Sequence, residues 1–380
     1  MLTTNKKPIS IHNDPWEAYN DIIDNGQLTL SNIEFTTTNL CNMRCSHCAV
    51  GYTLQTQDPE PLPMDIIYRR LDEIPHLRTL SITGGEPMFS KKSIKNVVKP
   101  LLKYAYQRGI YVQMNSNLTL PQDRYLDIAE YIDVMHISHN WGTIQEFTDV
   151  GFGAMKKQPP LKAKLKLYEQ MLDNASTLSD QGMFVSAETM LNQSTLPYLN
   201  KIHKEIVNDM KCSRHEVHPM YPADFASTLI VLSLKEMKEA IHHLLDIRDE
   251  DTWMLFGTLP IYPCINDEND QHLLQRLRHA KNVTMRNDPD GRSRLNVNVF
   301  TGNVIVTDFG DENGTISNIQ NDKLTDVFKQ WLNSDLAQSL NCHCAEYQCL
   351  GPNVLVKNMY YPNTDFKENE KAMHAKRIFS

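Results

Sequence analysis

Short strand-like runs alternate with longer amphipathic stretches along most of the chain, starting near residue 30. The strand-like runs are Ile33–Asn39, Thr79–Thr83, Tyr111–Asn117, Val134–Asn140, Phe184–Leu191 and Arg214–Met220. Between them, helix-period patterns lie near Pro63–His76, Ser93–Arg108, Pro121–Tyr131, Leu161–Asp180 and Leu196–Met210. Six strand–helix units in series predict an α/β fold with a parallel sheet and right-handed crossovers.

Apolar and polar residues alternate within several of these strands. In the run 111–117, for example, Val112 and Met114 alternate with Gln113 and Asn115. A parallel sheet that is covered on both faces has nearly continuous apolar strands instead, and a closed barrel fills its interior with branched residues. We therefore expect one face of the sheet to pack on helices. The other, polar face is expected to line an open cavity that holds a polar ligand.

The patterns outside these units predict further elements. Asp14-Pro15 indicates the start of a helix that runs to Asp24, and Ser233–Asp249 has the apolar stripe of another helix. Further along, the sequence predicts a hairpin of Leu295–Phe300 and Val304–Asp308, and then a helix over Leu324–Leu340. The predicted domains are an N-terminal arm and helix (1–29), a core barrel (30–222), a linker helix region (223–260) and a small C-terminal domain (261–380).

Composition and charge narrow the class of protein. The chain has 380 residues, a net charge of −8 and eight cysteines. The N-terminus does not resemble a signal peptide, and no apolar run reaches the roughly 20 residues of a membrane span, so we expect a cytoplasmic protein. In that compartment, cysteines indicate metal binding rather than disulfides. Without a basic run, nucleic acid is not an expected partner.

Three of the cysteines, Cys41, Cys45 and Cys48, form a CxxxCxxC triplet directly after the first strand-like run. Three thiolates on one loop can hold three irons of a [4Fe–4S] cluster, which usually takes four cysteines. One iron is then left open for another ligand. Ferredoxin-type runs and structural zinc sites use different spacings.

A Gly84-Gly85-Glu86-Pro87 segment follows the second strand-like run. With the cysteine triplet, it resembles the signature of the radical S-adenosylmethionine (radical SAM) superfamily. The resemblance implies a partial (β/α)6 barrel and a cluster whose open iron is chelated by S-adenosylmethionine. It also implies cleavage of that molecule to a 5′-deoxyadenosyl radical, which abstracts hydrogen from a substrate, and a flavodoxin or ferredoxin-type electron donor.

The resemblance also assigns residues to S-adenosylmethionine. The GGE segment would receive the methionyl ammonium, and polar residues near the ends of the middle strands would contact ribose and adenine. The predicted cofactor-binding residues are Gly84, Gly85, Glu86, Asn115, Ser138 and Glu188.

A second cysteine cluster, with Cys342, Cys344 and Cys349 in a CxCxxxxC arrangement, lies near the C-terminus. It resembles the motif of a small radical SAM family labelled YfkAB-like, and its setting resembles the auxiliary-cluster SPASM and twitch domains. Those domains usually carry a cysteine after the hairpin, where this chain has Asp308. Cys264 is the candidate for the fourth ligand. The four thiolates are expected to hold a second [4Fe–4S] cluster, with zinc as the alternative.

The substrate cannot be derived from these motifs. Relatives with auxiliary clusters often modify peptide or protein side chains, which makes this the first hypothesis. A small metabolite or a tRNA base is the second. A non-catalytic iron–sulfur or zinc protein for electron transfer or sensing is the third, and the GGEP segment and the polar strand face argue against it.

Overall fold

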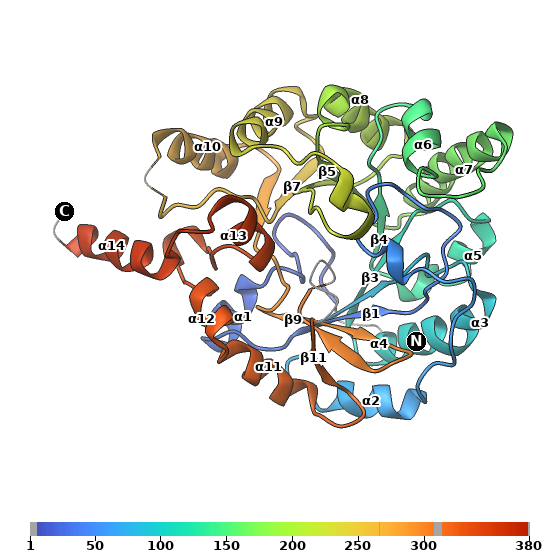
Figure 1. Cartoon of the computed structure of the whole chain (residues 1–380), viewed down its shortest axis with the longest axis horizontal. Coiled ribbons are helices and arrows are strands. Elements are labelled where there is room, and N and C mark those ends of the chain that lie inside the picture. Colours follow the sequence, from blue (N-terminus) through green and yellow to red (C-terminus); the bar gives the residue numbers. More distant parts are fainter. Residues whose placement is uncertain (1–5, 266, 308–313, 379–380) are drawn as a thin grey trace.

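The computed structural model of the protein describes residues 6–265, 267–307 and 314–378. Within them the strands form an eleven-stranded sheet in the order β11-β10-β9-β1-β2-β3-β4-β5-β6-β7-β8 (Figure 1). The six predicted strands are β1 (Asn32–Thr36), β2 (Thr79–Thr83), β3 (Tyr111–Ser116), β4 (Val134–Ser138), β5 (Val185–Leu191) and β6 (Arg214–Pro219). They pair in parallel and in chain order, as predicted.

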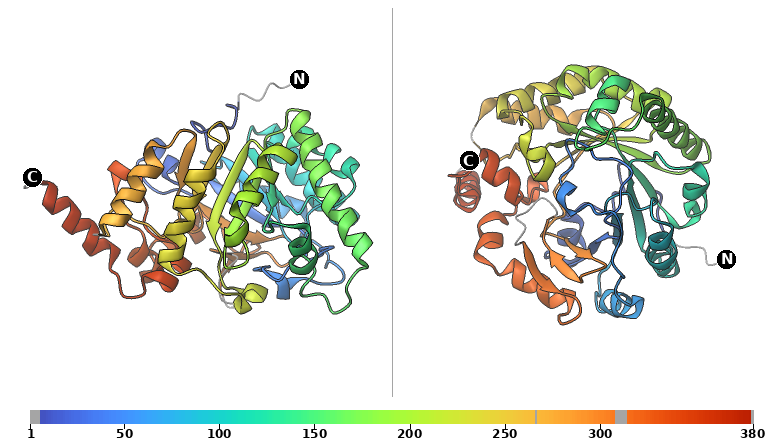
Figure 2. Two further views of the ribbon diagram at one scale, coloured as in Figure 1. Left: turned by 90° about the horizontal axis from the view of Figure 1, so that it is seen from above. Right: turned by 45° about the vertical axis from the view of Figure 1, so that its right-hand side comes forward.

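Helices surround the curved sheet on its outer side, which gives the molecule a barrel-like shape (Figures 1 and 2). The helices that connect or follow the strands are α2 (Met64–Asp72), α3 (Lys91–Ser93), α4 (Lys99–Gln107), α5 (Gln122–Leu126), α6 (Ile144–Val150), α7 (Leu161–Asp180), α8 (Leu199–Lys204), α9 (Leu234–Ile247) and α10 (Glu268–His279). The alternate strand residues Val112, Met114, Met135 and Ile137 are fully buried in the main hydrophobic cluster. The apolar strand face therefore packs on helices, as the alternation predicted.

The sheet extends beyond the six predicted strands. The region 223–260, predicted as a linker helix, contains α9 but also β7 (Trp253–Gly257), and β8 (Val283–Arg286) adds to β7 in parallel. β9 (Arg294–Asn298) then pairs in parallel with β1 at the opposite edge. The alternation of apolar and polar residues did not predict β7, because its residues are buried throughout and form a continuous apolar run.

The predicted hairpin is present and belongs to the same sheet. β10 (Asn303–Ile305) pairs antiparallel with β9, and β11 (Thr315–Asn318) pairs antiparallel with β10. Asp308, which ends the predicted second strand, lies outside the described residues. Because β9 is hydrogen-bonded to β1, the hairpin is an extension of the barrel sheet.

Two helix predictions need correction. The N-terminal helix α1 (Tyr19–Asn25) begins later than predicted, because the residues after Pro15 form turns in which Glu17 accepts a hydrogen bond from the Tyr19 amide (2.8 Å). The helix predicted over residues 324–340 is divided into α11 (Leu324–Leu332) and α12 (Asp335–Leu340). Ser334 divides it by capping α12, since its side chain accepts a hydrogen bond from the Ala337 amide. α13 (Val354–Tyr360) and α14 (Phe366–Ile378) follow.

The N-terminal arm lies along the inner side of the sheet, between its two ends. The Trp16 indole donates a hydrogen bond to Ser81 of β2 (3.2 Å), whereas Asp14 pairs with Arg286 of β8 (3.3 Å). Asp21 of α1 pairs with Arg78, just before β2 (3.0 Å). The arm therefore connects β8 with the β1–β2 side of the barrel, where the described strands form no ladder between β8 and β9.

Candidate active site

The cysteine triplet lies on the long loop between β1 and α2. This loop is held to the end of α6 by backbone hydrogen bonds: the Arg44 amide donates to the Gly151 carbonyl (3.1 Å) and the Ser46 amide to the Val150 carbonyl (2.8 Å). The Cys48 amide donates to the Cys45 carbonyl (3.1 Å), which closes a turn inside the motif. The segment after β4 that anchors the loop carried no recognisable sequence signal.

The three thiols lie close enough to influence one another. Burial raises the pKa of Cys45 well above its usual value, and the charges of Cys41 and Cys48 raise it further. Two N–H groups reach the Cys41 sulfur, from the Met43 amide (3.4 Å) and from the Asn117 side chain (3.8 Å). Three clustered thiols with N–H donors aimed at one sulfur fit the demands of an iron–sulfur cluster, whose sulfurs accept such hydrogen bonds.

Gly84 and Gly85 allow the loop after β2 to pack directly on the start of the cysteine loop. The Gly85 amide donates to the Thr38 carbonyl (2.8 Å), and the Glu86 amide donates to the Leu40 carbonyl (2.7 Å). A Cβ on Gly84, whose φ is +142°, would lie 2.4 Å from the Thr38 oxygen, and one on Gly85 would lie 2.3 Å from the Leu40 oxygen. The close approach of two backbones thus requires glycine at both positions, and the contact of both glycines with S-adenosylmethionine stays a prediction.

The Glu86 side chain is fully buried and its carboxylate already has protein partners. It accepts hydrogen bonds from the Ser116 hydroxyl (2.9 Å) and from the amides of Asn117 (2.8 Å) and Met88 (3.2 Å). Burial raises the pKa of this carboxyl to about 7, against the lowering effect of these donors. These contacts hold the carboxylate in place, and its binding of the methionyl ammonium stays a prediction. Glu86 also holds the end of β3, which places Asn117 beside Cys41.

We expect the Glu86→Gln substitution to destabilise the fold around the cysteine loop. An amide NH₂ would replace one of two oxygens that each accept hydrogen bonds from N–H or O–H donors, so a donor would face a donor. The expected loss is about 1–3 kcal/mol of unfolding free energy. Chemical denaturation of the metal-free protein measures it, with the exposed Glu130→Gln as the matched control. If the variant is as stable as the Glu130→Gln control, the Glu86 carboxylate does not stabilise the fold, and its proposed role is binding the cofactor.

The other three predicted cofactor residues lie together on the polar strand face. Ser138 of β4 is the register partner of Glu188 of β5, and Asn115 of β3 is the partner of His136, two residues before Ser138. Asn115 accepts a hydrogen bond from the Gln113 side chain (2.8 Å). The structure thus brings these side chains to neighbouring strands, whereas their contacts with S-adenosylmethionine stay a prediction.

Glu188 belongs to a charged group inside the barrel. Its carboxylate is hydrogen-bonded to His136 (2.8 Å). Burial alone would raise its pKa, but the hydrogen bond from His136 and the positive charges of His218 and Arg286 lower it to about 2. The carboxylate is therefore held in its ionised form, able to accept hydrogen bonds from a polar ligand.

A second group of charged side chains lies beside it and was not found from the sequence. Glu216 of β6 is 1% exposed and forms ion pairs with Arg214 (3.0 Å) and Arg286. Its other neighbour is His218, at 2.7 Å. Arg286 lies on β8, a strand that the sequence did not predict, so its position inside the barrel could not be expected. The interior is polar as predicted, and its charges are largely paired with one another.

The four cysteines of the predicted auxiliary site come together in the fold. Cys264 lies on the loop after β7, and the other three lie between α12 and α13. Burial raises the pKa of Cys264 to about 11, with a further contribution from Cys344. Burial also raises the pKa of Cys349 to about 12, to which Cys264 and Cys344 add. A fourth ligand must lie near the CxCxxxxC motif, and Cys264 meets this requirement.

The surroundings of this auxiliary site suit an anionic group. Cys344 and Cys349 pair through two backbone hydrogen bonds (2.9 and 3.1 Å), and the Gly351 amide donates to the Cys349 sulfur (3.4 Å). A Cβ on Gly351 would lie 2.7 Å from the Cys342 sulfur, so only glycine leaves room there. The positive charge of Arg292 acts on both Cys342 and Cys349. These features fit a cluster with four thiolate ligands.

Zinc, the alternative at the auxiliary site, makes a different geometric demand. A single zinc ion needs all its ligands at about 2.0–2.3 Å, whereas each thiolate of a cubane binds a different iron. Among the described residues, no group of three or more His, Cys, Asp or Glu side chains is arranged for a single metal ion. Zinc stays the alternative to a second cluster at the auxiliary site.

The described helices are all too short or too polar to traverse a bilayer.

Comparisons with known proteins give the class of this chain. Residues 35–209 match the radical SAM superfamily, and residues 220–371 match the YfkB-like domain. The chain is 60% identical to YfkA of Bacillus subtilis (strain 168) over 367 residues, which are 97% of this chain and 98% of that one. The protein is a radical SAM enzyme, with S-adenosylmethionine and a [4Fe–4S] cluster as the cofactors of its class. Within that class, the chain belongs to the YfkAB-like family.

Solved structures show the same fold at low sequence identity. SuiB of Streptococcus suis bound to S-adenosylmethionine is 14% identical, with a TM-score of 0.59 over 88% of this chain and 76% of that one. The anSMEcpe structure with AdoMet and the Cp18Cys peptide is 13% identical, with a TM-score of 0.58 over 92% and 95% of the two chains. The predicted fold class, a radical SAM barrel with a small C-terminal domain, is confirmed. Because the chain belongs to a superfamily of enzymes, the hypothesis of a non-catalytic iron–sulfur or zinc protein is wrong.

Proposed function

We propose that the enzyme cleaves S-adenosylmethionine reductively at a [4Fe–4S] cluster held by Cys41, Cys45 and Cys48, and abstracts hydrogen from a peptide or protein substrate. The bound cluster would supply one electron to the sulfonium, which yields methionine and a 5′-deoxyadenosyl radical. The single observation that carries the proposal is the clustering of three thiols on a loop that is braced by Gly84, Gly85 and the Glu86–Asn117 contact.

The chain's own residues orient and shield this chemistry. Asn117 donates to the Cys41 sulfur (3.8 Å), so the end of β3 is tied to one predicted ligand. The Asn115, Ser138 and Glu188 side chains line the adjacent strands and are proposed to bind the nucleoside part of S-adenosylmethionine. In this arrangement the radical would form at the carboxyl ends of the strands, where barrel enzymes gather their ligands.

The auxiliary site is proposed to hold a second [4Fe–4S] cluster on Cys264, Cys342, Cys344 and Cys349. Support comes from the proximity of the four thiols and the positive charge of Arg292. A flavodoxin or ferredoxin-type protein is the proposed electron donor.

A peptide or protein is favoured over a small metabolite or a tRNA base by two relatives of the same fold. SuiB has been solved with its precursor peptide SuiA, and anSMEcpe with the Cp18Cys peptide. The net charge of −8 also disfavours a tRNA substrate.

The test is the cleavage reaction itself. We expect anaerobically reconstituted, dithionite-reduced protein to form 5′-deoxyadenosine and methionine from S-adenosylmethionine, measured by chromatography and mass spectrometry. Omitting dithionite should abolish both products, because the sulfonium must receive an electron. A reconstituted protein that binds S-adenosylmethionine but yields neither product would contradict the proposal.

A further inference from the structure

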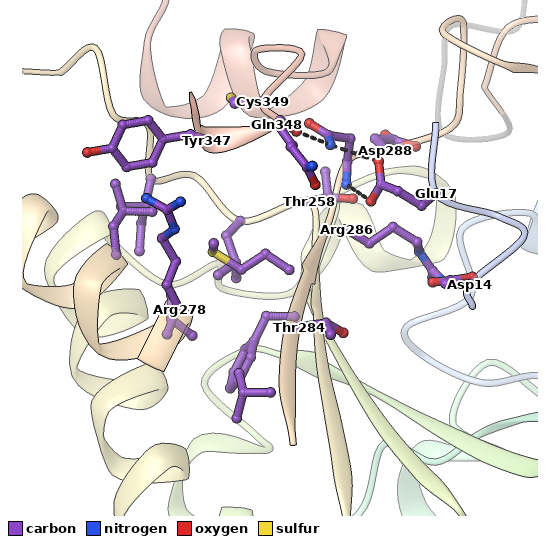
Figure 3. A pocket seen from close by; sticks show the side chains of 18 of the residues that line it. Asp14, Glu17, Thr258, Arg278, Thr284, Arg286, Asp288, Tyr347, Gln348 and Cys349 are labelled. Carbon is purple, nitrogen blue, oxygen red and sulfur yellow. Dashed lines mark hydrogen bonds and ion pairs between the residues drawn. The ribbon is translucent and has the colours of Figure 1, made fainter. Parts of the chain in front are cut away.

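β8 is the last strand of the sheet, and its free edge lies in a cavity of about 530 Å³. The N-terminal arm, the loop after β7 (residues 258–263), α10 and residues 346–353 form the remaining walls, and Cys349 of the auxiliary site is among the lining residues. Figure 3 shows β8 passing between Asp14 and Glu17 on one side and Arg278 and Tyr347 on the other. Cavities of this size commonly bind ligands.

The backbone of β8 has hydrogen-bonding groups that point away from its neighbour. The Asn282 carbonyl accepts from the Met254 amide (2.9 Å), and the Arg286 carbonyl accepts from the Thr258 amide (3.1 Å). Since the peptide groups of a strand point alternately to its two sides, the N–H and C=O of Val283 and Met285 face away from β7. In the described chain no strand pairs with that side.

The two faces of β8 differ in character. The Val283 and Met285 side chains pack against the apolar cluster that includes Leu274 and Leu277 of α10. The opposite face carries Thr284, which accepts a hydrogen bond from the Trp253 indole (2.7 Å), and Arg286 with its partner Asp14. A strand added at this edge would therefore place alternate side chains in an apolar and in a polar environment.

Side chains at the rim of the cavity contact the auxiliary-site loop on one side and the N-terminal arm on the other. The Arg278 guanidinium lies over the Tyr347 ring at 4.6 Å and donates to the Glu346 carbonyl (3.0 Å). On the arm side, Asn287 donates to Glu17 through its amide (3.0 Å) and its side chain (2.8 Å). Contacts between residues far apart in the sequence therefore hold the cavity walls on both sides of β8.

We propose that an extended peptide segment, alternating apolar and polar residues, binds in this cavity as an added strand on β8. This proposal rests on the proposed function, because the bound segment would belong to the peptide or protein substrate. Two backbone N–H and C=O pairs, two residues or about 6.6 Å apart, match the repeat of an extended chain. Main-chain hydrogen bonds supply affinity in this mode, and the two side-chain environments supply specificity.

The test uses the full-length protein and an array of nine-residue synthetic peptides in which Val, Leu or Phe alternates with Thr, Ser or Lys. Bound peptides are then titrated in solution by fluorescence anisotropy against wild type, Met285→Pro and the matched control Met285→Leu. Proline removes an N–H that faces away from β7, a position where edge strands accept it. We expect binding to weaken at least about tenfold, or 1.4 kcal/mol, in Met285→Pro and to be retained in Met285→Leu.

A second measurement does not depend on the folding of the proline variant. In the best-bound peptide, N-methylation is placed in turn at successive residues. Because only every second amide of an added strand faces β8, methylation should weaken binding to wild type at alternate positions. If no peptide of the array binds, if Met285→Pro binds as tightly as Met285→Leu, or if all positions respond equally, the proposal is wrong.

These outcomes are separate from the proposed chemistry. Formation of 5′-deoxyadenosine is measured in the same samples without peptide. Peptide binding without this product would reject the proposed function and leave the docking edge, whereas the product without peptide binding would reject the docking edge alone.

Discussion

Replacing Cys45 by alanine should abolish formation of 5′-deoxyadenosine, because a loop with two thiolates no longer holds the cluster that binds S-adenosylmethionine. Cys45 lies between Cys41 and Cys48 and is influenced by both, so its loss opens the middle of the site. Iron in the reconstituted protein should fall from about eight to about four atoms per chain, the content of one remaining cubane. Iron analysis and product assay measure the two effects.

Cys212→Ala is the matched control for this variant. Cys212 is buried, and burial alone raises its pKa, without a contribution from another cysteine. It should keep its iron and its product formation. Undiminished cleavage in Cys45→Ala would show that the triplet is not the site of the cluster.

The double substitution Cys342→Ala/Cys344→Ala should also remove about half of the iron, about four of about eight atoms. Unlike Cys45→Ala, it should keep the cleavage of S-adenosylmethionine, because its cysteines lie on a different loop from the triplet. Turnover of a substrate would be lost if the auxiliary cluster accepts or supplies electrons. Iron, zinc and 5′-deoxyadenosine are measured in parallel.

Cys264→Ala tests the fourth ligand within the same experiment. If Cys264 ligates the auxiliary cluster, its loss should resemble the double substitution in iron content. Full iron in the double variant would reject the auxiliary cluster, and wild-type zinc that disappears in it would establish the zinc alternative.

Short motifs carried the resemblance that predicted the class of this enzyme. The spacing of Cys41, Cys45 and Cys48 fits three thiolates on one turn, and the period-two alternation in the strands indicates which side chains face inward. Both are short-range properties, because a loop motif and a strand face depend on neighbouring residues. The parallel sheet of β1 to β6 followed from the same patterns.

The role of Glu86 depended on tertiary structure. Its carboxylate meets Ser116 and Asn117, some 30 residues away, and the sequence contains no signal for this pairing. Burial without a partner would be costly for a carboxylate, and the surrounding donors offset that cost. The signature motif alone could not predict these donors.

The sequence by itself determined the CxxxCxxC loop, the six-stranded core and the CxCxxxxC motif as separate features. Only the tertiary structure decided how they fit together. It paired β9 with β1, extended the sheet to a free edge at β8, and brought Cys264 to Cys344 and Cys349. These contacts join residues far apart in the chain. Their formation depends on the burial and backbone pairing of the whole sheet, which no local pattern encodes.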